Sequence, residues 1–185
     1  MRIIAGKFRG RRLSNFKAEH IRPTTDRVKE SIFNKLQGYF EGTRVLDLFS
    51  GTGNLTCEAI SRGAMHVDSV ELSKKSIAII RDNLKLLEIG DEVTVINDDV
   101  LKFLAKYNGP PYDVVIADPP FTEKLADSVL TALSQCPAVG PETVIVIEAS
   151  SHEMVRESYP TLECRDTRDY GDKQVSFWRK AGAGE

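Results

Sequence analysis

The chain has 185 residues, a formal net charge of −2 and 41% hydrophobic residues. It is long enough for one domain with a substantial core and too short for two large domains. No apolar run approaches the roughly 20 residues that a membrane span needs, and no signal-peptide pattern follows Met1 and Arg2. The three cysteines are widely spaced and form neither a disulfide framework nor a zinc motif. We therefore expect a cytoplasmic monomer with no metal and no membrane partner.

The first 20 residues form a basic leader. Residues 1–35 carry ten Lys or Arg against three Asp or Glu, whereas the rest of the chain carries fifteen against twenty-four. Two glycines and the alternating apolar residues Ile3, Phe8 and Leu13 predict a small β-hairpin. Because phosphate contacts supply most non-specific affinity for nucleic acids, the charge favours a nucleic-acid contact, and a solvated hairpin is the alternative. The candidate contact residues are Arg2, Lys7, Arg9, Arg11, Arg12 and Arg22.

A helix over residues 25–40 is predicted to follow an extended segment. Pro23 disfavours helical backbone at the residue before it, and Thr24, Thr25 and Asp26 can each cap a helix. Four apolar side chains recur at helical spacing and are predicted to pack in the core: Val28, Ile32, Phe33 and Leu36.

A buried strand at 44–49, a glycine-rich turn and a helix at 55–62 come next. This is the layout of a nucleotide-binding crevice at the carboxyl end of a parallel sheet. The third glycine of the dinucleotide pattern is replaced by Thr56, and Asp47 would repel a pyrophosphate. A positively charged cofactor without phosphate, such as S-adenosylmethionine, fits better. The candidate cofactor-binding residues of this motif are Asp47, Phe49, Ser50, Gly51, Gly53 and Asn54.

Two further predicted strands, 66–72 and 93–97, end near acids. Glu71 lies 20 positions after Gly51, where an acid commonly accepts hydrogen bonds from the ribose hydroxyls of a nucleoside. Asp99 is the candidate acceptor for the adenine amino group, although either Asp98 or Asp99 could instead be the N-cap of the next helix. The candidate cofactor contacts of this region are Glu71, Leu72, Ser73, Asp99 and the Val100 backbone N–H.

The sequence Asp118-Pro119-Pro120-Phe121 directly follows a predicted strand at 113–117. The prolines lack N–H donors, so local carbonyls are left free to accept hydrogen bonds from a ligand. Asp118 adds a charged acceptor, and Phe121 offers a face on which a heterocycle can stack. These four residues are the candidate catalytic site for a planar amino group. A strand end closed by two prolines is the alternative.

Helical patterns at 74–88, 102–106 and 123–136 alternate with the strands, and a further strand is predicted at 143–148. This alternation predicts an α/β fold with a doubly wound parallel sheet. A C-terminal β-hairpin is predicted from two further strand segments, 162–169 and 174–179, which are joined by a turn with Gly171.

The order of the motifs DLFSGTG, Glu71, Asp99 and DPPF resembles that of class I S-adenosylmethionine-dependent methyltransferases. The leader RIIAGKFRGRRL and the segment RPTTDRVKESIFN are similar to the RsmD family, and the likeness covers essentially the whole chain. The resemblance implies a Rossmann-like sheet with an antiparallel C-terminal strand, a β-hairpin extension at 1–20 and a methyltransferase domain at 21–181. It also implies that the segment with Arg22 and Thr24 lies across the cofactor and helps form an RNA face; for Thr24 and Asp26 the alternative is that they only cap an amphipathic helix that covers the sheet.

The resemblance further implies the activity. Members of the family transfer a methyl group to the N2 amino group of guanine 966 in bacterial 16S ribosomal RNA, so the implied partner is that RNA in the small ribosomal subunit. Two alternatives stay open. A DNA adenine-N6 methyltransferase shares the motif order but generally needs a target-recognition domain, for which this chain has no room. A non-catalytic RNA-binding assembly factor is the other, and the intact DPPF motif speaks against it.

Overall fold

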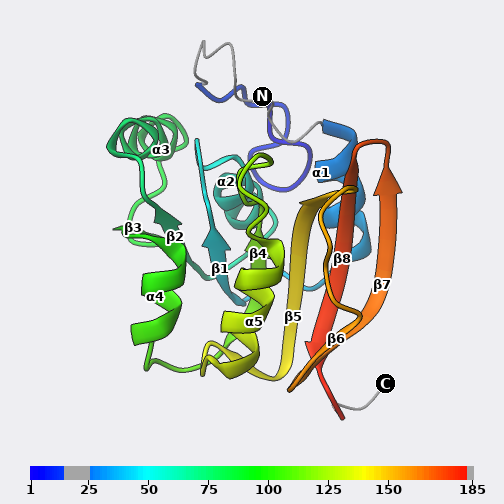
Figure 1. Cartoon of the computed structure of the whole chain (residues 1–185). Coiled ribbons are helices and arrows are strands. Elements are labelled where there is room, and N and C mark those ends of the chain that lie inside the picture. The colour runs from blue at the N-terminus through cyan, green and yellow to red at the C-terminus, as the bar shows by residue number, and fades with distance from the viewer. Residues whose placement is uncertain (15–25, 183–185) are drawn as a thin grey trace.

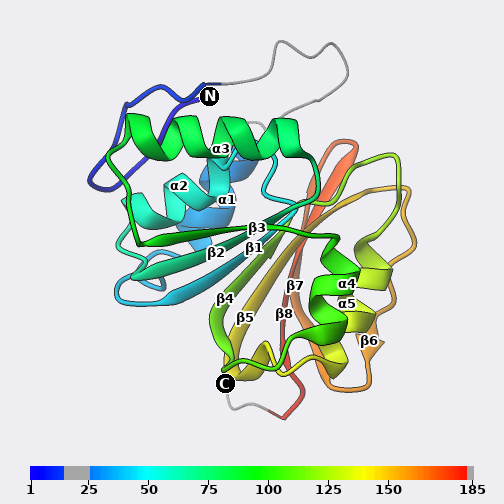
Figure 2. The same ribbon diagram turned by 90° about the vertical axis from the view of Figure 1, so that its left-hand side faces the viewer.

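The computed structural model describes residues 1–14 and 26–182. Its centre is an eight-stranded sheet with helices on both faces (Figures 1 and 2). The helices are α1 (Asp26–Lys35), α2 (Asn54–Ser61), α3 (Lys74–Leu86), α4 (Val100–Lys106) and α5 (Ala126–Gln135). The strands are β1 (Arg44–Leu48), β2 (His66–Glu71), β3 (Val93–Asn97), β4 (Tyr112–Ala117), β5 (Val139–Ser150), β6 (Ser158–Tyr159), β7 (Leu162–Tyr170) and β8 (Lys173–Lys180).

The sheet has the strand order β3-β2-β1-β4-β5-β8-β7-β6. The pairs among the first five strands are parallel, and the pairs that involve β6, β7 and β8 are antiparallel. The order reverses between β1 and β4, which is the position where open α/β sheets bind ligands. The predicted fold class is therefore confirmed.

Alternate residues of the central strands face two different helical layers. Val45, Val114 and Val146 pack with side chains of α1, α2 and α3. On the other face, Leu46 and Ile145 pack with α4 and α5. Figure 2 shows the sheet between these two layers. Because both faces are covered, β1 and β4 are almost continuous apolar runs, and a polar residue among them needs a specific explanation.

The predicted elements match the observed ones to within two residues at most ends, with four differences, one of which is that β5 spans Val139–Ser150 rather than the predicted 143–148. The first helix ends at Lys35 rather than near Phe40, and Gly38 follows it with a φ of 86°. The last helix begins at Ala126 rather than Glu123, because Lys124 adopts a positive φ of 49° that helical backbone does not allow. The short strand β6 was not predicted. None of the helices in the described ranges combines the length and the apolar character of a membrane span.

Residues 1–14 form a compact loop on the helical layer of α1, α2 and α3. An antiparallel bridge joins Arg2 and Arg12, and the N–H groups of Ile3 and Leu13 donate to the carbonyls of Arg11 and Met1 at 2.9 and 3.1 Å, so the two halves of the loop pair as in the predicted small hairpin, although neither half is a regular strand. The loop is also fastened to α2, since the Lys7 N–H donates to the Ser61 carbonyl at 2.8 Å. Gly6 permits this approach, since a Cβ there would lie 1.7 Å from the Ser61 carbonyl oxygen. Residues 15–20 of the predicted extension lie outside the described residues.

Glu58 of α2 is the anchor of the N-terminal loop. Its carboxylate is buried and accepts hydrogen bonds from the backbone N–H groups of Ile4 at 2.9 Å and Ala5 at 3.1 Å. It also receives the Arg62 guanidinium at 2.8 Å and the Lys29 ammonium at 3.0 Å. A buried carboxylate is tolerated when such partners compensate for its lost hydration.

Lys29 extends the same network to the loop and to the glycine-rich turn. Its side chain is fully buried, and Nζ donates to the Arg2 carbonyl at 2.7 Å and to Asn54 Oδ1 at 2.9 Å. This role could not be inferred from the local sequence, in which Lys29 is an ordinary helix charge. Its ammonium ties together α1, α2 and the N-terminal loop.

We expect Glu58→Gln to lower the free energy of unfolding by about 3 kcal/mol, because it leaves the buried Lys29 ammonium without its charged partner. Urea unfolding monitored by circular dichroism measures the change. Glu30→Gln, an exposed charge on α1, is the matched control and should change stability by less than about 0.5 kcal/mol. Equal stabilities for the two variants would contradict the role assigned to Glu58.

Candidate active site

The acids singled out in the sequence all lie at one edge of the sheet. Asp47 is in β1, Glu71 ends β2, Asp99 follows β3, and Asp118 follows β4. Since these strands are neighbours in the order β3-β2-β1-β4, their carboxyl ends meet at the same edge. The structure therefore brings the predicted cofactor motifs and the DPPF motif together.

The turn between β1 and α2 is held in an unusual backbone conformation. Phe49, Gly51 and Gly53 have φ values of 62°, 56° and 76°. A positive φ at a bulky non-glycine residue costs of the order of 1–2 kcal/mol, and such strain is typical of ligand sites. Ser50 fixes the turn from inside, because its hydroxyl donates to the Asp47 carbonyl at 2.8 Å. The backbone of this turn is thus preformed.

Asp47 is buried beneath the turn, with a relative exposure of 1%. Its Oδ2 accepts a hydrogen bond from the Thr56 hydroxyl, while Oδ1 has no hydrogen-bond partner among the described residues. Burial raises the pKa of Asp47 to about 7; the Thr56 hydroxyl opposes the shift, and the nearby charge of Asp118 adds to it. A buried carboxylate oxygen without a donor fits a cationic ligand group, which would restore its ionised form.

Glu71 links the glycine-rich turn to the start of α3. Its carboxylate accepts from the backbone N–H of Gly51 at 2.8 Å and from that of Ser73 at 2.7 Å. Ser73 is the N-cap of α3, and Leu72 between them is 64% exposed. Glu71 therefore orders both the glycine-rich turn and the start of α3, and its contact with a ribose stays a prediction.

Asp99 is the N-cap of α4, since its Oδ1 accepts from the Lys102 N–H at 2.9 Å. The alternative reading of this acid as a cap is confirmed, and the adenine contact stays a prediction. Asp98 forms an ion pair with Lys106 and accepts from the Asp99 N–H. Val100 is buried at the first position of the helix.

The DPPF motif forms a loop that leaves the sheet at the end of β4. The Asp118 N–H bonds to the Leu48 carbonyl at 3.4 Å, which ties the loop to the end of β1. Asp118 is half-buried and Pro119 is buried, whereas Pro120 and Phe121 are exposed, Phe121 by 43%. An exposed aromatic ring beside a half-buried carboxylate is an arrangement that can stack a base and accept from its amino group.

Two residues that the sequence did not suggest stand beside this loop. Glu148 of β5 and Lys173 of β8 form a buried ion pair, with exposures of 4% and 6%. Burial, and next the negative charge of Asp118, raise the pKa of Glu148, while Lys173 opposes the shift. No local motif marks these residues, because they meet only through the pairing of β5 with β8.

The remaining predicted contacts divide into two groups. Thr24 and Arg22 lie outside the described residues. The side chains of the loop at residues 1–14 are described, and Arg2, Lys7, Arg9, Arg11 and Arg12 are all exposed. Arg11 donates to the Leu86 carbonyl at 2.8 Å. The loop also reaches the glycine-rich turn, since Asn83 bonds to the carbonyls of both Ser14 and Thr52.

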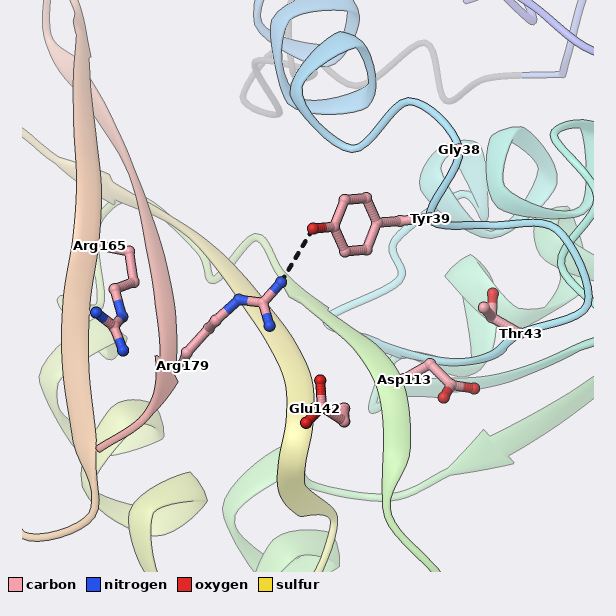
Figure 3. A pocket seen from close by; sticks show the side chains of 7 residues that line it. All are labelled: Gly38, Tyr39, Thr43, Asp113, Glu142, Arg165 and Arg179. Carbon is pink, nitrogen blue, oxygen red and sulfur yellow. Dashed lines mark hydrogen bonds between the residues drawn. The ribbon is translucent and has the colours of Figure 1, made fainter. Parts of the chain in front are cut away.

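A separate surface pocket opens at the opposite edge of the sheet (Figure 3). Its lining mixes charges of both signs, and the Arg179 guanidinium already donates to the Tyr39 hydroxyl at 3.0 Å. The lining residues are Gly38, Tyr39, Thr43, Asp113, Glu142, Arg165 and Arg179. Because ligands of such sheets bind at the carboxyl ends of the strands, the edge with Asp47 and Asp118 is the better candidate site.

The parallel order with an antiparallel pair at one side defines a class I methyltransferase fold. A solved structure from Escherichia coli, yhhF, which is described only as a candidate methyltransferase, superposes with a TM-score of 0.83. The two sequences are 29% identical, and the match covers 97% of each chain.

The chain belongs to the family described as conserved hypothetical protein 95, whose model matches residues 1–179, and this confirms the resemblance to the RsmD family. The chain is 41% identical to the ribosomal RNA small subunit methyltransferase D of Haemophilus influenzae over 80% of this chain and 78% of the relative. It is 34% identical to the protein of the same name from Escherichia coli K12, over 88% of this chain and 79% of the relative.

Asp47→Asn should stabilise the protein above neutral pH and weaken cofactor binding. The raised pKa means that the folded state binds a proton at Asp47 more tightly than the unfolded state does, so wild-type stability is lost as the pH rises from about 4 to about 7. Asparagine does not titrate, so the variant should gain roughly 1–3 kcal/mol over wild type across this window.

Urea unfolding at a series of pH values measures this gain, and calorimetry measures S-adenosylmethionine affinity, which should fall about tenfold or more. Asp91→Asn, at an exposed acid, is the control. A constant stability difference across the pH series would show that Asp47 is not the titrating group.

Proposed function

We propose that this protein transfers a methyl group from S-adenosylmethionine to the N2 amino group of a guanine in 16S ribosomal RNA, at the position called 966. The observation that carries the proposal is the convergence of two features at one edge of the sheet: the DPPF loop, and Asp47, whose buried Oδ1 has no hydrogen-bond partner in the part of the chain that the structure describes. The names of the relatives support a small-subunit RNA as the substrate class.

The residues present fit the cofactor. Asp47 would hold its cationic methionine end, Glu71 its ribose, and Asp99 with the Val100 N–H its adenine. The preformed turn from Phe49 to Asn54 would lie against it, with Leu72 and Ser73 at the sugar side and Thr24 contributing from the segment before α1. When bound, S-adenosylmethionine supplies a methyl group that is already activated on a sulfonium.

The protein's own contribution is to position and polarise the amino group. Asp118 and the Pro119 carbonyl accept the two N–H bonds, which draws the nitrogen toward pyramidal geometry and directs its lone pair to the methyl carbon. The Asp118 carboxylate also stabilises positive charge as it develops on that nitrogen. Phe121 stacks on the base. Pro120 has no backbone N–H, so it cannot compete with the substrate amino group for the carbonyl oxygens of the loop.

The RNA must deliver an unstacked guanine, which costs a few kcal/mol and is least costly in a loop. The exposed arginines of the N-terminal loop and Arg22 hold the backbone of that RNA through phosphate contacts. The protein acts in the cytoplasm as a monomer without a metal. DNA adenine methylation is the second candidate, since a DPPF loop serves adenine N6 equally well, and the substrate panel below separates the two.

The primary experiment offers labelled S-adenosylmethionine with unmodified small subunits, naked 16S RNA and double-stranded DNA in turn. Methylation of the subunit or its RNA at a guanine N2, located by primer extension, supports the proposal. Methylation of DNA adenine would replace it with the second candidate. Cofactor binding without transfer to any substrate would favour a non-catalytic assembly factor.

Asp118→Ala should leave cofactor affinity within about threefold of wild type and lower the single-turnover rate at least roughly a hundredfold, because Asp118 acts mainly in the transition state. Rapid-quench kinetics with saturating RNA gives the rate, and calorimetry gives the affinity. Asp113→Ala, an exposed acid at the other end of β4, is the matched control. Near wild-type rates for Asp118→Ala would refute the proposed hold on the amino group.

Neutralising Arg9, Arg11 and Arg12 together should weaken RNA binding and flatten its dependence on salt. Each lost phosphate contact lowers the log–log slope by a little under one unit. RNA binding across a salt series measures the slope, with calorimetry to show that cofactor affinity is unchanged. The control neutralises three lysines on other surfaces, Lys102, Lys106 and Lys180. Equal slopes for both triple variants would show that the arginines are only a solvated surface.

A further inference from the structure

Three charged side chains lie in a row on one face of the sheet at the DPPF loop. Ala117 pairs with Ile147, so the next residues, Asp118 and Glu148, occupy corresponding positions on neighbouring strands. Paired residues of neighbouring strands project to the same face. Glu148 pairs with Val175 on β8, and Lys173, two residues away, shares that face.

The formal charges of these three side chains sum to −1. Glu148 forms a buried ion pair with Lys173 through Oε1, while its Oε2 has no hydrogen-bond partner among the described residues. The charge of the Asp118 carboxyl group lies close enough to Glu148 to raise the pKa of Glu148. A proton held between the two carboxyl groups would supply the donor that Oε2 lacks.

The described charged side chains of α1 have other partners or are exposed. The Lys29 ammonium bonds to Asn54 and Glu58, and Lys35 forms an ion pair with Asp166. Glu30 is exposed. The described charges that act on Glu148 are therefore Asp118 from the end of β4 and Lys173 from β8.

We propose that Glu148, held in place by Lys173, is the positioning partner of Asp118 and that the two carboxyl groups share the proton released from the methylated amino group. This inference rests on the proposed function and adds to it the destination of that proton. Asp118 touches the substrate, and Glu148 acts through Asp118.

The step balances as a simple proton transfer. The amino nitrogen, once it carries the methyl group, bears a positive charge and one hydrogen more than the product keeps. Its N–H bond breaks with the electron pair remaining on nitrogen, and an O–H bond forms on Asp118. The proton is then shared with Glu148 across a carboxyl–carboxylate hydrogen bond, and the Lys173 ammonium balances the charge that remains. Exchange with water after product release restores both carboxylates.

Burial and the Asp118 charge raise the pKa of Glu148 above that of an ordinary glutamate, which suits a group that holds a proton near neutral pH. The alternative is that the Glu148–Lys173 pair only fastens β5 to β8. That structural role predicts lower stability on mutation but no change in how the site titrates.

The first test uses the ligand-free protein and does not depend on activity. Carbon-13 NMR of glutamate carboxyl groups follows Glu148, assigned by its loss in Glu148→Gln. We expect its midpoint to lie well above the roughly 4.3 of an unperturbed glutamate, to fall in Asp118→Asn and to rise in Lys173→Met. Lys173→Arg should retain the wild-type midpoint. A Glu148 that titrates at an ordinary midpoint in the wild type would overturn the inference.

The second test is the pH profile of single-turnover methyl transfer. In the wild type the rate should rise as the carboxyl pair loses its proton. Glu148→Gln should move this acidic limb to lower pH by at least about one unit and lower the plateau about tenfold or more, with cofactor affinity unchanged. Lys173→Met should move the limb to higher pH. Glu142→Gln, exposed on the same strand β5, is the control and should match wild type.

The outcomes separate the two proposals. An active wild type whose acidic limb is unchanged in Glu148→Gln would overturn the shared proton and leave the proposed function intact. A wild type that methylates no RNA, with Glu148 titrating as expected in NMR, would refute the proposed function and leave the carboxyl pair established. Glu148→Gln is isosteric, so we expect it to fold, and a thermal melt checks this. If Glu148→Gln fails to fold, Asp118→Asn tests the same carboxyl pair by NMR.

Discussion

The organisation of this molecule depends on carboxylates that the fold buries without full compensation. Asp47 and Glu148 each keep one oxygen without a hydrogen-bond partner among the described residues, and burial raises the pKa of both. Such groups reduce stability, so two apolar layers must support the sheet that holds them. A cationic ligand at Asp47 and a proton at Glu148 are the two simplest ways to relieve the cost. The site therefore combines two buried carboxyl groups that are not fully compensated with the unfavourable backbone conformation of Phe49.

Glu58 shows the opposite treatment of a buried carboxylate in the same chain. Its two oxygens receive two backbone N–H groups, a guanidinium and an ammonium. Nothing is left for a ligand, and its role is to fasten residues 1–14 to α2. Both acids are buried, but the oxygens of Glu58 all have donors, whereas Asp47 Oδ1 has none among the described residues. This difference distinguishes a structural acid from a candidate functional one more clearly than burial does.

Sequence reasoning could predict features that depend on local pattern. The strand runs, the glycine-rich turn, the acids after β2 and β3, and the DPPF loop are each contained in a short segment, and their meeting point follows from the rule that parallel strands end at one edge. Glu148 and Lys173 could not be predicted in this way. Their contact depends on β8 entering the sheet beside β5, and Lys29 likewise meets Glu58 only after α1 packs on α2. Long-range pairing leaves no periodic signal.

The same long-range contacts join the proposed RNA-binding loop to the proposed cofactor site. The Lys29 ammonium bonds to the Arg2 carbonyl in the N-terminal loop and to Asn54, the residue that begins α2 directly after the glycine-rich turn. A shift of the loop on binding RNA would therefore have to break a buried charged hydrogen bond or move the turn with it. Thermodynamic linkage requires any effect of RNA on cofactor affinity to be matched by an equal effect of cofactor on RNA affinity. Since one buried lysine carries both contacts, the network that stabilises the fold is also a route by which the two proposed ligands can influence each other.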